Sequence, residues 1–424
     1  MNNMKRIAIY LLLAVPALWL DSCVVYRAVR YGSPGIDDYR TFPQDTIRRG
    51  DHTFAFAETP HEERIFDTLR AFRSAGGPTT AAQALAAEKK MSCGVLLIRN
   101  DSILFEYYQG KIGRSDVSTV FSISKSLTAL LCGIAVDEGF IRSVDDPVTD
   151  YIAELRDADP RFARLTIGHL LDMRAGLKFK ENYSFNPFSG MARLHYGRNM
   201  LRQMKHLKFK EEPGTSFEYC SMSTAILGIV IERATGRSYA DYMSEKVWQP
   251  LGMESDALMS LDAVRIRYPR AYGGVSATAR DLAKVGRLYM NRGRFGDRQI
   301  VDSAWVDTTF SVERAHANSG KKVTGYSYSW WRDLRPVFND NGGLSFADTE
   351  AARRRIEALG IGDDAVTGHE QGSDKCYVFR KEGIFKMVGM LGQTVYVDPS
   401  RNVILVILTN KEIQLLAETI FDNL

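Results

Sequence analysis

The alternation of apolar and polar residues predicts strands near both ends of the chain. The early stretch CGVLLIRNDSILFEYYQG (93–110) holds two apolar runs around Asn100, Asp101 and Ser102, which is a hairpin signal. Short alternating or β-branched runs return late, in GYSYSWW, GIFKMVGM, QTVYVDP and NVILVILTN, joined by glycine or by the turn residues 398–402. Since hairpin joints favour antiparallel pairing, the early and late strands are expected to share one antiparallel sheet.

Between these strands the apolar residues recur mostly at helical spacing, from Ser122 to about Trp248. A last helix is predicted to begin near Glu412. The pattern therefore indicates an α/β (α+β) fold, in which an antiparallel sheet is flanked by helices. A helical lobe at about 125–245 is inserted between the two groups of strands, and a cleft is expected beside it.

The rest of the chain is expected to divide into a lead-in and one large domain. Residues 23–85 form a loosely patterned lead-in, in which an amphipathic stretch at 65–72 is predicted to pack as a helix. Residues 86–424 then form the folded domain. We find no internal repeat and no low-complexity tract that would indicate a different organisation.

The first residues have the pattern of an export signal. Lys5 and Arg6 precede an apolar run at 7–20, which is shorter than the about 20 residues that a membrane span needs. The end of this run, with leucine three residues before Cys23, resembles a bacterial lipoprotein cleavage site. We therefore expect a signal peptide at 1–22 and a lipid on Cys23, which gives an exported protein bound to the outer membrane. An uncleaved N-terminal anchor is the alternative.

Composition and charge exclude several classes of function. The 424 residues are 45% hydrophobic and 25% charged, with a net charge of +4, which is too mild to indicate a nucleic-acid partner. The other four cysteines are too widely spaced for a metal site, and the seven histidines are scattered. His169 is expected to be a hydrogen-bonded helix residue. No metal is predicted, and the Gly-x-Ser-x-Gly motif of the α/β-hydrolases is missing.

One serine is placed for nucleophilic chemistry. Ser122 stands three residues before Lys125 at the start of an apolar helix, so both side chains lie on one helical face. The free N–H groups and positive dipole end of the first turn favour an anionic oxygen there, and a buried lysine can take the serine proton. A helix cap beside a surface lysine is the alternative. Ser319 and Lys322 show the same spacing, but in a glycine-containing stretch typical of a solvated loop.

Five stretches together carry a resemblance to a known superfamily. From about 90 to 410 the chain resembles the serine β-lactamases and penicillin-binding proteins, and it is most similar to the class C-like branch with esterases and 6-aminohexanoate-dimer hydrolases. The resemblance implies a β-lactamase/transpeptidase-like fold and an acyl-enzyme on Ser122 without a cofactor. The stretches are VFSISKS, LTIGHLLDMRAGLKFKENY, PGTSFEYCSMSTAILGIVIERATGRSYADYMSEKVWQPLGM, AYGGVSATARDLAKVGRLYMNRG and GMLGQTVYVDPSRNVILVILTN.

The superfamily's second motif, Tyr-x-Asn or Tyr-x-Ser, matches Tyr219-Cys220-Ser221. The resemblance makes Tyr219 catalytic beside Lys125, whose charge would lower the pKa of a phenol. The two groups titrate as a unit, so which one takes the serine proton stays open. Ser221 and Tyr183 are candidates for substrate binding.

Each of these aromatic assignments has a plain packing alternative, which also applies to Trp330 and Trp331. Tyr31-Gly32-Ser33 shows that the tripeptide also arises by chance.

The third motif, Lys-Thr-Gly or His-Thr-Gly, falls on Met387-Val388-Gly389, so Met387 and Gly389 are also candidates for substrate binding. In the superfamily the cation of this motif helps to hold a substrate carboxylate, and methionine cannot do so. Lys386 is adjacent, but strand alternation turns it to the other face. The missing charged hydrogen bond removes about 1.5 to 3 kcal/mol of recognition. The departure from the motif does not affect the backbone. Gly389 still allows close approach to a ligand, and the N–H of Met390 can join that of Ser122 as an oxyanion hole.

These residues predict a serine hydrolase that cleaves an ester or amide bond of a small molecule through Ser122. A D-alanyl-D-alanine carboxypeptidase or β-lactamase would use the same residues, but Met387 disfavours a substrate with a carboxylate. A non-catalytic binding protein on the same fold is a further alternative. The expected partners are a small ester or amide substrate and a membrane, reached through the lipid on Cys23. The oligomeric state is left open.

Overall fold

A computed structural model describes residues 24–60, 65–74, 77–184, 186–311, 325–369 and 374–424. The predicted signal peptide, the lipidation residue Cys23 and the second serine–lysine pair, Ser319 and Lys322, lie outside the described residues. In the described parts of the chain, no helix is both long enough and apolar enough to span a bilayer.

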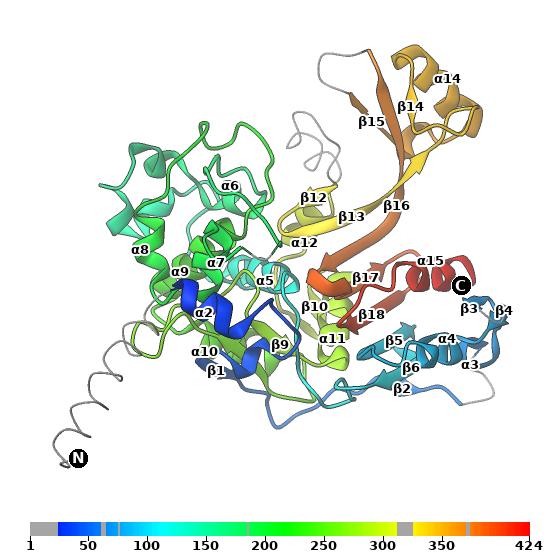
Figure 1. Ribbon diagram of the computed structural model, residues 1–424, viewed down its shortest axis with the longest axis horizontal. Helices are drawn as coiled ribbons and strands as arrows, with labels where there is room; N and C mark the ends of the chain where they lie inside the picture. Colours follow the sequence, from blue (N-terminus) through cyan, green and yellow to red (C-terminus); the bar gives the residue numbers. More distant parts are fainter. Residues whose placement is uncertain (1–23, 61–64, 75–76, 185, 312–324, 370–373) are drawn as a thin grey trace, which may run out of the picture.

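The main sheet joins the early and the late part of the chain (Figure 1). Its described strands run in the order β12-β13-β16-β17-β18-β5-β6-β2, and β14 and β15 also pair with β16. All of these pairings are antiparallel except that of β2 with β6. The strands are β2 (Ala57–Glu58), β5 (Cys93–Arg99), β6 (Ser102–Gln109), β12 (Tyr326–Ser327), β13 (Trp330–Val337), β14 (Ser345–Phe346), β15 (Ala365–His369), β16 (Cys376–Val388), β17 (Thr394–Asp398) and β18 (Val403–Thr409).

The predicted antiparallel sheet is confirmed, and local sequence explains its centre. Strands β5 and β18 pair from Cys93 opposite Thr409 to Arg99 opposite Val403. The β5–β6 hairpin turns at Asn100 and Asp101, whose φ angles of 50° and 60° are left-handed, as a two-residue turn of this hand requires. The central strands are apolar throughout because both of their faces are covered by buried side chains.

Two cores lie on opposite faces of the sheet. The larger core unites one sheet face with the helical lobe, and the smaller one lies beneath helices α3, α4 and α15. Alternation along β5 sends Leu96 and Ile98 into the first core and Val95 and Leu97 into the second. The covering elements are α3 (Ile65–Thr68), the β3–β4 hairpin (Phe72–Ser74 and Gly77–Thr79), α4 (Ala81–Ala87), α11 (Ala279–Met290), α12 (Ser303–Phe310) and α15 (Gln414–Asp422).

The helical lobe is built around two buried fifteen-residue helices, α5 (Ile123–Asp137) and α9 (Ser221–Thr235). These two helices pack against each other, and α6 also packs on α9. The predicted helical character of the segment after Ser122 is therefore confirmed. The other helices and short turns of the lobe are η3 (Val148–Asp150), η4 (Ala153–Leu155), η5 (Pro160–Arg164), α6 (Ile167–Leu171), α7 (Gly190–Tyr196), α8 (Met200–Met204), α10 (Tyr239–Met243) and the π-helical turn η6 (Ser244–Trp248).

The described part of segment 23–85 is built into the domain, which differs from the loose lead-in expected from its pattern. Helix α2 (Val24–Tyr31) packs on α7, with Ala28 fully buried. The Arg27 Nε donates to the carbonyl oxygen of Tyr196 over 2.7 Å. Contacts so distant in sequence leave no local pattern. The segment also supplies β1 (Gln44–Ile47) to a second sheet with β7 (Ser118–Thr119), β8 (Ala257–Ser260) and β9 (Val275–Ala277), and it includes η1 (Asp38–Arg40).

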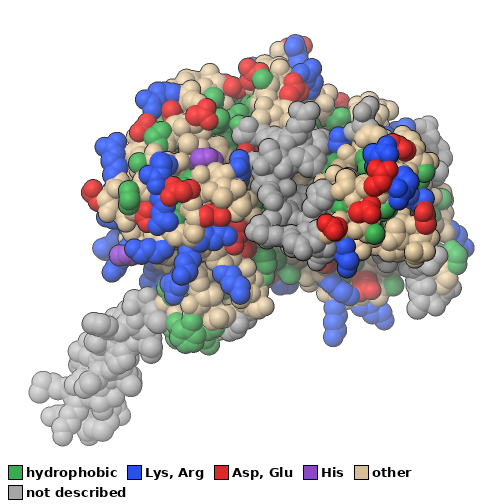
Figure 2. Space-filling view, turned by 90° about the horizontal axis from the view of Figure 1, so that it is seen from above, with side chains coloured by type: hydrophobic (Ala, Val, Ile, Leu, Met, Phe, Trp, Pro, Cys, Tyr) green, Lys and Arg blue, Asp and Glu red, His purple; other side chains and the backbone are tan. Residues whose placement is uncertain are grey.

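An arm projects from the sheet where β13 and β16 extend beyond their neighbours (Figure 1). It carries β14, β15, η7 (Gly362–Asp364) and α14 (Thr349–Leu359), which enclose a small core of their own. This arm was not anticipated from the sequence. Figure 2 shows acidic and basic side chains mixed over the arm and the helical lobe, in keeping with the small net charge. A short hairpin, β10 (Arg294–Phe295) with β11 (Arg298–Gln299), follows α11.

Candidate active site

Ser122 directly precedes helix α5 but does not act as its cap. Its side chain forms no capping hydrogen bond; instead its Oγ accepts a hydrogen bond from Lys125 Nζ over 2.8 Å. The preceding residue, Phe121, has a left-handed φ of 48°, which is unfavourable for a bulky side chain. Such strain persists only where the surrounding structure holds it, and it is common at active sites. The structure thus favours the reactive interpretation of Ser122 over the cap.

Lys125 is buried, unlike the surface lysine of the alternative interpretation. Its side chain is 1% exposed, and Nζ also donates to the carbonyl oxygen of Tyr272 over 2.8 Å. Nζ lies 4.9 Å from the ring centroid of Tyr219. Among the described residues no carboxylate forms an ion pair with this ammonium. The lysine is therefore held by Ser122, a carbonyl oxygen and aromatic rings alone.

Tyr219 lies beside Lys125, although the two residues are far apart in the sequence. Its ring stacks on Trp331, with centroids 5.7 Å apart, and meets Tyr326 edge to face at 5.9 Å. Within the described part of the chain, its hydroxyl forms no hydrogen bond. The helix that follows, α9, fixes the backbone at this point. Ser122, Lys125 and Tyr219 are thus brought together as predicted, while Trp330 is a core residue at 1% exposure.

The end of strand β16 lies against the backbone at Ser122. A Cβ added to Gly389 would lie 2.3 Å from the carbonyl oxygen of Val120 and 3.4 Å from the nitrogen of Ser122, so only glycine allows this approach. Met390 begins the short turn η8 (Met390–Gly392) and lines the same cleft as Ser122. The end of β16 and Met390 therefore lie at the same cleft as the backbone of Ser122.

Met387 does not belong to the site, which corrects its assignment as a substrate-binding residue. Its side chain is 0% exposed in the main core, opposite Val395 on β17. It is not among the described residues that line the cleft. The neighbouring Lys386 faces away as alternation predicted, and its Nζ donates to Asp333 over 2.6 Å. The motif position thus supplies neither a cation nor a contact surface.

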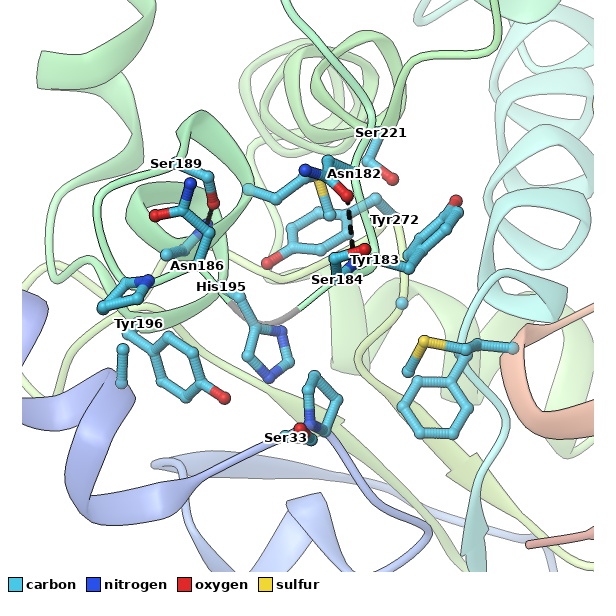
Figure 3. A pocket seen from close by; sticks show the side chains of 18 of the residues that line it. Ser33, Asn182, Tyr183, Ser184, Asn186, Ser189, His195, Tyr196, Ser221 and Tyr272 are labelled. Atoms are coloured by element: carbon cyan, nitrogen blue, oxygen red, sulfur yellow. Dashed lines mark hydrogen bonds between the residues drawn. The ribbon is translucent and has the colours of Figure 1, made fainter. Parts of the chain in front are cut away.

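A cleft opens at Ser122. Figure 3 shows Ser221 and Asn182 on one side, Ser33 on the other and His195 between them. Among the described residues that line it, none is a lysine, arginine, aspartate or glutamate. The lining residues are Ala28, Ser33, Pro34, Phe121, Ser122, Asn182, Tyr183, Ser184, Asn186, Pro187, Ser189, Met191, Ala192, His195, Tyr196, Ser221, Tyr272, Gly273 and Met390.

The N-terminal segment forms one wall of this cleft, which sequence reasoning missed. Tyr31-Gly32-Ser33 served there only as an example of a chance tripeptide, yet Ser33 lines the cleft and Tyr31 stacks on Tyr196. His195, also in the wall, lies 3.1 Å from Asp38 through Nε2. Burial lowers the pKa of His195, so its ring is neutral near neutral pH. The walls of the cleft are therefore uncharged.

Glu181 is a second missed residue, and it binds two predicted ones. Its Oε2 accepts from the backbone N–H of Ser221 over 2.9 Å, and its Oε1 accepts from Ser221 Oγ over 2.6 Å. The Tyr183 hydroxyl also donates to Oε1, over 2.8 Å. In the sequence a lone glutamate after Lys180 is typical of a solvated charge, so no local signal identified it.

No metal centre is visible in the described parts of the chain, where no group of histidine, cysteine and carboxylate side chains could hold an ion. The Nδ1 of His169 accepts from the N–H of Thr166 in a helix cap, as its predicted helical role required. Four described cysteines are buried and unpaired: Cys93, Cys132, Cys220 and Cys376.

The chain is similar in sequence to known hydrolases. The 6-aminohexanoate-dimer hydrolase of Paenarthrobacter ureafaciens is 29% identical over 259 residues, which are 58% of this chain and 65% of that protein. Esterase EstB of Burkholderia gladioli is 28% identical over 367 residues, which are 77% and 88% of the two chains. The chain thus spans just under two thirds of the first relative and most of the second.

A Bacillus anthracis protein assigned as a 6-aminohexanoate-dimer hydrolase shares the fold, with a TM-score of 0.66 and 20% identity over 90% of each chain. A family model described as Beta-lactamase matches residues 79–418, the greater part of the chain. The main sheet apart from β2, the helical lobe and the serine at the start of α5 are all contained in this match. The chain therefore belongs to the β-lactamase family.

Proposed function

We propose that this hydrolase of the β-lactamase family cleaves an ester or amide bond through an acyl-enzyme on Ser122. The observation that carries the proposal is the 2.8 Å hydrogen bond from the fully buried Lys125 to Ser122 Oγ, with the Tyr219 ring beside the same ammonium. A serine hydroxyl becomes a nucleophile when an adjacent base can take its proton. Similarity to an esterase and to an amide hydrolase supports both substrate classes.

In the first half-reaction Ser122 Oγ attacks the carbonyl carbon, and its proton passes to Lys125 in its neutral amine form or to Tyr219 in its phenolate form. The N–H groups of Ser122 and Met390 stabilise the oxyanion. Such hydrogen bonds lower the barrier most when the donors are already in position before the reaction. The same base returns the proton to the leaving alcohol or amine as the bond to carbon breaks. Water then adds to the acyl-enzyme, and Ser122 leaves with a proton as the free acid is released.

The cleft supports a substrate without a carboxylate. A carboxylate needs a cation or several N–H donors to replace its hydration. None of the described lining residues is a lysine or arginine, and the motif position that would supply a cation is Met387, which is buried. This disfavours penicillins and D-alanyl-D-alanine peptides, and it favours a neutral ester or amide.

A fluorophosphonate probe tests the proposal, because it reacts only with an activated serine. We expect one adduct per chain, which peptide mass spectrometry places on Ser122. With labelled penicillin we expect no comparable adduct, and with nitrocefin no turnover. An unlabelled protein would indicate a binding protein on the same fold, and rapid penicillin labelling would indicate a carboxypeptidase or β-lactamase instead.

A Gly389→Ala substitution tests the role of the β16 backbone. The new methyl group would collide with the carbonyl oxygen of Val120, so the strand must move and carry the Met390 N–H with it. Loss of one oxyanion donor lowers kcat by about 10² to 10³. The matched control is Gly383→Ala within β16, the strand that Gly389 directly follows, where nothing lies within 4 Å of the added Cβ. Equal kcat values for the two variants, both folded, would contradict the assigned oxyanion hole.

A further inference from the structure

The surface beside helix α2 gathers exposed apolar side chains. Among the described residues, ten large apolar side chains are exposed, and four of them lie here: Val29, Tyr31, Val264 and Ile266. Tyr31, Val264 and Ile266 line one groove, which runs between the end of α2 and the 262–268 loop. Val29 is exposed on the outer side of the same helix. Single exposed apolar residues are ordinary, but a cluster of them indicates an interaction surface.

The 262–268 loop holds its apolar tip in a fixed position. The N–H of Asp262 donates to the carbonyl oxygen of Tyr268 over 2.9 Å, which closes the loop. The Asp262 carboxylate in turn accepts from the backbone N–H groups of Met200 and Tyr268 over 3.0 and 2.9 Å. Val264, near the tip, is nevertheless 70% exposed. Because the tips of turns in water are normally polar, a valine fixed there favours a partner that is itself apolar.

The charged side chains of this groove are mostly basic. They are Arg27, Arg198, Arg265, Arg270 and Asp262. Asp262 is buried, and its carboxylate is occupied by the two N–H groups above. Arg265 is exposed between two apolar neighbours, and it forms no hydrogen bond or ion pair with another described residue. An anionic group can therefore pair with this guanidinium.

The chain that leads into α2 indicates a lipid bilayer as the partner. Residues 1–22 are expected to be an export signal followed by a lipid on Cys23, or else an uncleaved apolar anchor. Either one would join the bilayer to Val24, the first residue of α2. Tyr31 ends this eight-residue helix, which rises about 1.5 Å per residue, so the groove begins about 12 Å from the point of attachment. A single lipid chain holds a protein only weakly, and stable attachment needs a second contact with the membrane.

We propose that Val29, Tyr31, Val264, Arg265 and Ile266 form a docking face that rests on an anionic lipid bilayer. The apolar side chains enter the boundary between headgroups and acyl chains, and Arg265 pairs with lipid phosphate. Because α2 also contributes Ala28 to the wall of the Ser122 cleft, docking places that cleft near the bilayer surface. The inference goes beyond the acyl transfer proposed above and does not depend on it.

A Val264→Trp substitution tests the apolar contact, because bromine quenches tryptophan emission at close range. The full chain is reconstituted into vesicles of phosphatidylcholine and phosphatidylglycerol, with and without brominated acyl chains, and the emission of the unsubstituted chain is subtracted. Insertion of the docking face by about 5 to 10 Å brings the added ring to the acyl chains, so its emission should fall at least about twofold. The matched control is Leu344→Trp on the arm, where the leucine is 51% exposed. The emission added there should stay unquenched.

Arg265→Glu, made in the Val264→Trp chain, tests the electrostatic contact. It replaces attraction to anionic lipid by repulsion, so quenching should fall to the level seen on vesicles of phosphatidylcholine alone. Arg354→Glu is the matched control, because it changes the net charge equally at an exposed position on the arm. This variant should keep the quenching. All four positions are exposed, so the midpoint of thermal unfolding should change little.

Quenching in Val264→Trp no stronger than in Leu344→Trp would overturn the inference, as would quenching that Arg265→Glu leaves unchanged. Protection of the 262–268 loop from hydrogen exchange that rises with protein concentration, without vesicles, would show that a second copy of the chain covers this face instead. Fluorophosphonate labelling of Ser122 in the same samples judges the proposed function separately.

Discussion

Replacement of Ser122 by alanine is expected to abolish measurable hydrolysis of p-nitrophenyl esters. The change removes the oxygen that receives the Lys125 hydrogen bond, and with it the acyl-enzyme. Loss of a catalytic nucleophile typically lowers kcat by on the order of 10⁴ to 10⁶. Active-site titration under single-turnover conditions measures the loss, and the fluorophosphonate adduct should vanish with it.

Ser126→Ala is the matched control for this variant. Ser126 lies one turn further along, in α5, and is fully buried; its hydroxyl donates to the carbonyl oxygen of Ser329 over 2.6 Å, and it is not among the residues that line the cleft. Its loss costs on the order of 1 kcal/mol of stability and leaves the nucleophile in place. Substantial turnover by the Ser122→Ala protein, or an adduct on another serine, would contradict the proposed mechanism.

The contact between Ser122 and Lys125 was predictable from local sequence, because its geometry is local. A separation of three residues on one helix brings Ser122 and Lys125 together whatever the rest of the chain does. Tyr219 is different, since nothing in its own neighbourhood points to Lys125 and only the resemblance identified it. The sheet was predictable for the same local reason: the Asn100-Asp101 turn and the alternating runs define antiparallel hairpins.

The parts that were missed depend on contacts between distant segments. Glu181 becomes a functional candidate only when the chain folds Ser221 onto it, forty residues later. Ser33 joins the cleft because α2 packs on α7, which composition cannot reveal. Met387 was misjudged for a related reason: alternation predicts that Lys386 and Met387 face opposite ways, but the motif comparison alone did not show that the face of Met387 is sealed in the core.

The second large effect is expected from Lys125→Met. Methionine fills a similar volume with an apolar chain, but it can neither donate to Ser122 nor take up its proton. We expect kcat to fall by about 10³, since a positioned base contributes about 10² to 10⁴. The rate of fluorophosphonate labelling should fall in parallel. This rate measures the nucleophilicity of Ser122 alone, because the fluoride leaving group needs no protonation.

Stability is expected to respond very differently from activity in this variant. The ammonium of Lys125 is buried without a carboxylate partner among the described residues, so removing it relieves a desolvation cost that offsets the two lost hydrogen bonds. The midpoint of thermal unfolding should therefore change little.

Lys284→Met is the contrasting control. Lys284 is equally buried, at 0% exposure, but its Nζ lies 3.3 Å from Glu254 and 3.4 Å from Asp281. Its loss leaves the buried Asp281 without a cationic partner among the described residues and should cost about 3 to 5 kcal/mol. At temperatures where this variant is folded, its Ser122 should still label. Lys125→Met protein that unfolds as readily as Lys284→Met, or that labels at the wild-type rate, would show that Lys125 supports the fold and not the chemistry.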